Sequence, residues 1–350
     1  MRIFAPVFTA LILSTAIVAV RAQATNGGLT TFTYPGTNYR TQLVAINDSG
    51  VAVGWFSPPV QGATCDPVAF GGPCLPIDPS AAALNIPYAF SYSDGKFKRL
   101  RGPLVEVGNN MPLAITNSGK VLIVHGHFAN LPGGGSDLLV YDLATGTTRQ
   151  MEQAGLPSKG DESLIVGNLG HVSGMNSKGV VAGAGMLTEM EAGSPKHEYG
   201  LLIGIPNVHA MAASPDSGTS SFRHFEVSLQ SCPKKEANVQ YTDMQLAGPN
   251  DAGQIAISCG NEAIMYDSTT RHSMPISAPD PEYQMKIKGI SNNGSVVGCS
   301  PVTGRKPFLY TGGKTSLLPI PDENSCAMGI NNKGQIVGFT GDKAFIYTSH

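Results

Sequence analysis

The segment Gly329-Ile-Asn-Asn-Lys-Gly-Gln-Ile-Val-Gly338 decides the fold, because five other segments of the chain repeat its pattern without gaps. Each copy has an apolar stretch, a polar cluster of Asn, Asp, Ser or Lys that ends in Gly, and usually a second β-branched stretch. Asn and Asp bond to nearby backbone in turns, and Gly takes the left-handed conformation of a tight hairpin. Each copy therefore predicts a β-hairpin. The other copies are 45–54, 114–119, 174–183, 248–257 and 289–298.

A second element follows each hairpin at a variable distance and reads Ala-Phe-x-Tyr or a close variant, as at 89–92 and 344–347. In most copies a turn and another short strand come next, as at 96–100 and 315–318. Each unit is therefore predicted to be a four-stranded meander. We name its strands A to D in chain order.

The pattern GINxxGxIVG followed by AFLY resembles the HAF-type extracellular repeat proteins of bacteria, and the resemblance covers nearly all of the chain after its N-terminal segment. The His of the family's His-Ala-Phe is absent from all six copies, and Tyr88, Lys306 and Lys343 stand at that place in three of them. The resemblance implies a β-propeller-like repeat fold and export, and it carries no catalytic residues.

A closed ring follows from two features of the repeats. A four-stranded meander cannot bury both faces alone, and radial stacking of such units gives a propeller with short, protected edges. The last unit ends after strand C, while 29–34 is a strand without its own hairpin that can complete it as strand D. The sequence therefore predicts an all-β, six-bladed β-propeller of four-stranded antiparallel blades, closed by the N-terminal strand. A β-solenoid or sandwich is the alternative.

Small residues stand at the fifth position before every turn glycine, which fits blades that crowd together near an axis. These residues are Ala45, Ala114, Gly174, Gly248, Gly289 and Gly329.

The N-terminal residues 1–24 are predicted to be a signal peptide, because Arg2 precedes an apolar run at 3–20 and an Ala-Gln-Ala end. An uncleaved membrane anchor is the alternative. Residues 25–350 then form a single propeller domain, secreted or periplasmic, monomeric and without a membrane partner. The 42 glycines, 25 prolines and 14% charged residues favour short strands and tight turns. A net charge of −2 without a basic run gives no reason to expect nucleic acid.

Six cysteines, an even number, suit an oxidising compartment. Cys65 and Cys74 bracket a Pro/Gly-rich loop and are predicted to pair. Cys232 with Cys259, and Cys299 with Cys326, complete one of the pairings that six cysteines allow. None has zinc-type spacing, so we expect no metal, and no motif predicts a cofactor.

The length differences between repeats point to one face of the ring. In an A-to-D meander the A–B and C–D turns lie at one face, and the B–C and D–A connections lie at the other. Nearly all the extra length falls in the second set, at 56–87, 152–170, 187–198 and 212–243. Variable loops on a rigid scaffold commonly carry binding. Neutral insertion is the alternative.

Candidate site residues lie where strand A begins, at the mouth of the ring. His171, Asp243 and Lys286 are the candidate acids and bases of a catalytic funnel. Trp55, Asn110 and Lys288 are the candidate binding residues.

The leading functional hypothesis is a non-enzymatic module that binds an extracellular glycan or protein. Its rivals are a secreted hydrolase or lyase acting on a polymer in the central funnel, and a structural protein of the envelope.

Overall fold

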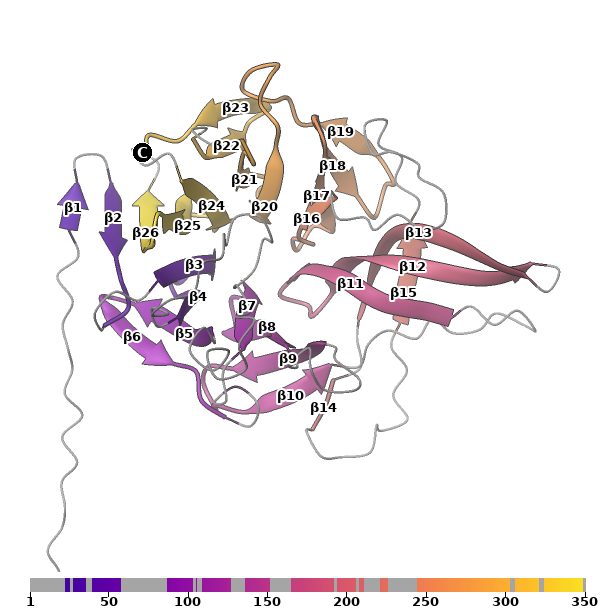
Figure 1. The fold of residues 1–350 in the computed structure, drawn as a ribbon, viewed down its shortest axis with the longest axis horizontal. Helices are drawn as coiled ribbons and strands as arrows, with labels where there is room; N and C mark the ends of the chain where they lie inside the picture. Colours follow the sequence, from indigo (N-terminus) through magenta and orange to yellow (C-terminus); the bar gives the residue numbers. More distant parts are fainter. Residues whose placement is uncertain are drawn as a thin grey trace, which may run out of the picture.

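The computed structural model describes residues 23–25, 28–35, 40–57, 87–102, 105, 109–126, 136–151, 165–191, 194–205, 208–210, 221–225, 244–302, 306–320 and 324–348. All regular elements within these ranges are β-strands, and small antiparallel sheets stand in a ring around a centre (Figure 1). The chain is thus an all-β propeller, and this part of the predicted fold class is confirmed. No helix of the described part is long and apolar enough to cross a membrane.

The strands form six sheets, and strand A of each lies nearest the centre (Figure 1). The first sheet holds β3 (Arg40–Ile46), β4 (Ala52–Ser57), β5 (Tyr88–Ser93) and β6 (Lys96–Arg99). The second sheet holds β7 (Asn110–Ile115), β8 (Lys120–Gly126), β9 (Ser136–Asp142), β10 (Thr148–Met151) and β14 (Val208–Ala210). The third sheet holds β11 (Ile165–Met175), β12 (Val181–Glu191), β13 (Ser194–Ile205) and β15 (Ser221–Phe225).

The remaining sheets follow the same order. The fourth sheet holds β16 (Gln245–Ala247), β17 (Gln254–Cys259), β18 (Glu262–Asp267) and β19 (Ser273–Pro275). The fifth sheet holds β20 (Lys286–Ile290), β21 (Val296–Cys299), β22 (Phe308–Thr311) and β23 (Lys314–Leu317). The sixth sheet holds β24 (Ser325–Ile330), β25 (Gln335–Thr340), β26 (Lys343–Thr348), β2 (Leu29–Phe32) and β1 (Gln23–Thr25).

Two sheets depart from the predicted four strands. After β13 of the third sheet, the chain crosses to the second sheet, where β14 pairs with β10 as a fifth strand. It then returns to the third sheet as β15. In the sixth sheet, β1 adds to β2. Strand β1 includes Gln23 and Ala24, the last two residues of the predicted signal peptide, whose other residues lie outside the described ranges. Cleavage after Ala24 would therefore leave β2 as the outer strand of that sheet.

The N-terminal strand contacts both the last and the first sheet. As expected from the sequence, β2 pairs antiparallel with β26, with Leu29 opposite Tyr347 and Phe32 opposite Ala344. The Phe32 ring then stacks on Tyr92 of the first sheet at 4.3 Å between ring centroids. The N-terminal strand thus contacts the last sheet through its backbone and the first sheet through the Phe32 ring.

The expected loop at 187–198 is wrong. Strands β12 and β13 continue their pairing to Glu191 opposite Ser194, so they form a long ribbon that projects from the ring (Figure 1). Likewise β11 begins at Ile165, inside the expected loop at 152–170. A two-stranded ribbon satisfies its own backbone hydrogen bonds beyond the edge of the ring, and its Gly, Pro and polar residues resemble those of a loop. Most of the other two long connections lies outside the described residues.

The two ends of the repeated motif are cross-strand partners. The glycine that ends the hairpin motif pairs with the phenylalanine of Ala-Phe-x-Tyr in three sheets. These pairs are Gly54 with Phe90, Gly298 with Phe308, and Gly338 with Phe345. Each of the three rings is fully buried. The glycine therefore leaves room for the ring, which covers it.

The Cys299–Cys326 disulfide joins β21 of the fifth sheet to β24 of the sixth, with 4.9 Å between the two Cα atoms. This predicted pair is confirmed. Cys259 is also disulfide-bonded. Its predicted partner Cys232 lies outside the described residues, as do Cys65 and Cys74, so those two pairings stay predictions.

Candidate functional site: the central channel

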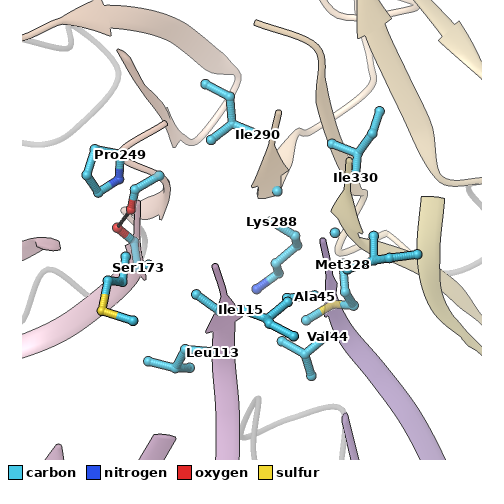
Figure 2. A pocket seen from close by; sticks show the side chains of 17 residues that line it. Val44, Ala45, Leu113, Ile115, Ser173, Pro249, Lys288, Ile290, Met328 and Ile330 are labelled. Atoms are coloured by element: carbon cyan, nitrogen blue, oxygen red, sulfur yellow. Dashed lines mark hydrogen bonds between the residues drawn. The ribbon is translucent and has the colours of Figure 1, made fainter. Parts of the chain in front are cut away.

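A β-bulge recurs in strand A of five sheets, six positions before the turn glycine. The pairing with strand B shifts there by one residue, as between Leu43 and Ala45 and between Ile287 and Gly289. A bulge leaves one residue without a partner and re-aims its side chain. The bulged residues all line a central channel (Figure 2). They are Val44, Leu113, Ser173, Lys288 and Met328.

The small residues next to these bulges let neighbouring A strands touch. A Cβ atom added to Gly329 would lie 2.7 Å from the carbonyl oxygen of Val44, and one added to Gly289 would lie 2.8 Å from the Cα atom of Gly329. A Cβ atom added to Gly174 would lie 2.9 Å from the carbonyl oxygen of Gly248. Real Cβ contacts are longer, so the predicted crowding of strands near the axis is confirmed.

An apolar ring lines the channel two residues beyond the bulges, on the side of the A–B turns. It is built by the residues four positions before each turn glycine, and these residues line the space on both sides of the ring. They are Ile46, Ile115, Met175, Pro249, Ile290 and Ile330.

The turn asparagines hold neighbouring sheets together. The side-chain oxygen of Asn331 accepts hydrogen bonds from the backbone N–H groups of Lys333 and Gln335, both at 3.0 Å. Its amide nitrogen donates to the carbonyl oxygen of Asn47 in the first sheet at 2.9 Å. Asn47, Asn176 and Asn250 bond in the same two directions. The local turn role predicted from sequence is correct, and the link to the next sheet was missed.

A second set of hydrogen bonds connects the A–B turns around the end of the channel. The Asp48 carboxylate accepts from the backbone N–H of Asn332 at 2.9 Å and from the side-chain amides of Asn332 and Asn117, both at 2.8 Å. Burial acts to raise the pKa of Asp48, but these bonds outweigh it and hold the pKa below its usual range. The equivalent Asp251 accepts from Ser177 and Asn292. The polar atoms at this end of the channel thus bond to one another.

Lys288 lies on the other side of the apolar ring and points into the channel (Figure 2). Its Nζ atom donates to the side-chain oxygen of Gln245 at 2.8 Å, and no carboxylate of the described residues pairs with it. Burial, and then the charge of Lys286, lower the pKa of Lys288 to about 8. The surrounding space measures about 480 Å³, part of it open to solvent.

Two of the three binding candidates lie elsewhere. Trp55 is only 8% exposed inside β4, with the Arg40 guanidinium 5.6 Å from its ring centroid. Asn110 is fully buried and donates to the carbonyl oxygen of Val105 at 3.1 Å, and its side-chain oxygen lies 3.0 Å from Nδ1 of His125. Neither offers the exposed surface that the sequence suggested. The third, Lys288, is in the channel.

The catalytic candidates are only partly described. Lys286 is exposed at the start of β20 in the fifth sheet. His171 belongs to the third sheet, where its backbone pairs with Ala184. Asp243 lies outside the described residues. The structure therefore brings Lys288, rather than Lys286, into the channel. The sequence signal for Lys288 was its fixed spacing to the turn glycine. The alternation of inward and outward residues along a strand does not reveal the bulge that turns this side chain inward.

Comparison with known proteins adds no family. No protein-family model matches the chain, and no curated protein matches it. One similar solved structure is a chain of a mitotic checkpoint complex, with a TM-score of 0.43, 10% identity, and coverage of 99% of this chain and 100% of that one. Another is the extracellular domain of a proposed one component system from B. thetaiotaomicron, with a TM-score of 0.40, 12% identity, and coverage of 93% and 40%.

A third similar structure is a puromycin-hydrolyzing peptidase of Mycobacterium tuberculosis, with a TM-score of 0.29, 11% identity, and coverage of 90% and 60%. Likenesses this low carry no argument about function, and the propeller class rests on the sheets of this chain.

Proposed function

We propose that the six sheets are the six blades of one propeller and that β2 closes its ring. Three observations support this. Strand β2 pairs with β26 while Phe32 packs on the first sheet. Hydrogen bonds of the repeat turns cross five of the junctions between neighbouring sheets in the described part of the chain. Residues of five A strands, together with Gly248 and Pro249 directly after β16, line one channel. A closed ring is a rigid scaffold.

We further propose that the chain is a HAF-type protein exported by residues 1–24 and that it acts as a non-enzymatic binding module. It recognises an extracellular glycan or protein through the face opposite the A–B turns. The difference between the two faces carries this proposal. At the A–B turns, short loops bond to each other around Asp48 and Asp251. The long connections leave from the opposite ends of the strands, as from Ser57 of β4.

The rival hypotheses have less support. A hydrolase or lyase in the funnel needs an acid and a base that meet, and of its candidates Lys286 is exposed and next to another lysine in β20. Among the described residues no group of three or more His, Cys, Asp or Glu side chains could hold a metal ion. A structural envelope protein would not need long connections concentrated on one face.

A binding screen of the exported protein against glycans, polymers and extracellular proteins tests the proposal. Shortening the connection at 58–86 is expected to weaken binding of a hit at least tenfold, because the binding surface is on that face. The control changes the opposite face by Lys96→Ala at the exposed start of β6, directly after the β5–β6 turn, and should leave binding unchanged. Equal loss in both variants would contradict the proposed face. No binding in the whole panel would favour the structural protein.

A further inference from the structure

We propose that the channel between the apolar ring and the starts of the A strands is a binding site for a small aliphatic carboxylate, with Lys288 as its anion-binding group. The described residues that line this site belong to the A strands and the residues that directly follow them, so the site does not rest on the proposed binding of a glycan or protein by the long connections.

The charge balance of the channel calls for an anion. A lysine ammonium has three N–H donors, and Lys288 uses one of them on the neutral side-chain oxygen of Gln245. The other four bulges present Val44, Leu113, Ser173 and Met328, and the Ser173 hydroxyl donates to the carbonyl oxygen of Gly248 at 2.8 Å. A partly buried cation without a paired carboxylate is costly. A bound carboxylate would supply the missing charge and acceptors.

The walls of the channel favour an aliphatic ligand. Val44, Leu113 and Met328 line the same space as Lys288 and give it apolar walls (Figure 2). No aromatic side chain of the described residues lines this space, so a sugar ring would find nothing to stack on. A short hydrocarbon chain would gain by leaving water there. The 480 Å³ around the amine includes open solvent, and only about 100 Å³ of it is enclosed enough to hold a ligand, which limits the ligand to a few heavy atoms.

The entry lies on the face away from the A–B turns. The apolar ring of Ile46, Ile290 and Ile330 and their counterparts separates Lys288 from the hydrogen-bonded A–B turns beyond it. Toward the starts of the A strands lie Gln245 and the exposed Lys286. A second positive charge on that side attracts an approaching anion.

Titration of the exported protein with sodium butyrate tests the site, and butyramide is the neutral control of the same shape. We expect one butyrate to bind per chain at pH 7, with butyramide at least tenfold weaker. Lys288→Met, which keeps the length of the side chain and removes its charge, should weaken butyrate at least tenfold. Lys314→Met, at an exposed lysine of β23 in the outer part of the same sheet, should change binding less than threefold. Lys288→Arg should retain binding.

The pH dependence isolates the amine. The pKa of Lys288 near 8 means that raising the pH from 7 to 9 removes most of its charge, so butyrate binding should fall about tenfold. Among the described residues, the other charged groups along the channel are Lys286 and, beyond the apolar ring, Asp48 and Asp251. The same pH change applied to Lys288→Met measures their contribution, and we expect little effect there.

Several outcomes would overturn the proposal. Equal binding of butyrate and butyramide would remove the role of charge. Full butyrate affinity in a folded Lys288→Met variant would show that Lys288 does not bind the anion. Binding of a uronate oligosaccharide or an acidic peptide through Lys288, without butyrate binding, would reject the small ligand. A variant shortened at 58–86 that binds butyrate but no longer binds the glycan or protein would separate this site from the proposed face.

Discussion

Replacing Gly338 with alanine should lower the free energy of unfolding by about 3 kcal/mol or more, the scale of overpacking in a closed interior. The added Cβ atom would run into the carbonyl oxygen of Cys326 in β24, and it would lie 2.8 Å from the ring of Phe345 in β26. Neither side can yield easily, because β25 is the middle strand between the two and the ring is fully buried.

Urea unfolding of Gly338→Ala measures this cost, and Gly95→Ala is the matched control. The control also replaces a glycine with alanine, but no atom lies within 4 Å of the Cβ added at Gly95. Only the left-handed backbone of Gly95, with φ of +76°, disfavours alanine there. We expect the control to lose about 1 kcal/mol. At the equivalent position β8 has Ile123, so the backbone of that strand accommodates a side chain there. Equal losses of unfolding free energy in the two variants would show that β25 shifts to a backbone position like that of β8.

Replacing Phe32 with alanine should cost about 3 to 4 kcal/mol, the usual loss for a buried aromatic ring. Phe32 is 4% exposed, stacks on Tyr92 and meets the edge of Phe97 at 5.6 Å between ring centroids. Its backbone belongs to the last sheet while these rings belong to the first. The loss should therefore affect the joint between the two ends of the chain of sheets.

Differential scanning calorimetry and urea unfolding measure this effect, with Thr30→Ala on the same strand as control. Thr30 pairs with Ile346 through its backbone, which alanine preserves, so we expect a loss below about 1 kcal/mol. A loss of less than about 1 kcal/mol for Phe32→Ala as well would mean that the N-terminal strand contributes little to the fold. Protease cleavage within 28–35 should also become faster in Phe32→Ala.

Much of the fold could be predicted from the repeats. The turn glycines and asparagines fixed the A–B hairpins, because a left-handed residue and a side-chain cap tolerate few alternatives. The small residues at Gly289 and Gly329 indicated the crowded axis. The unfinished last unit pointed to 29–34 as a partner for 344–347, and that pairing is observed. Each of these predictions rests on a local rule that repeats along the chain.

The site was harder to predict, because its geometry depends on register. A single extra residue in strand A turns Lys288 into the channel, and only the pairing with β21 shows that shift. Trp55 and Asn110 looked like binding residues because polar or aromatic side chains near loop entries often are. Both are buried, and their contacts with Arg40 and Val105 cannot be seen in the sequence. The β12–β13 ribbon was missed because its composition resembles a loop.

The pairing of the N-terminal strand with the last strand is the central claim, and nuclear Overhauser effects in the exported protein test it most directly. In the closed ring, cross-strand contacts should connect Thr30 with Ile346 and Phe32 with Ala344, and the amides of β26 should exchange slowly on both edges. Absence of these contacts, with fast exchange along the edge of β26 that faces away from β25, would contradict the closed ring.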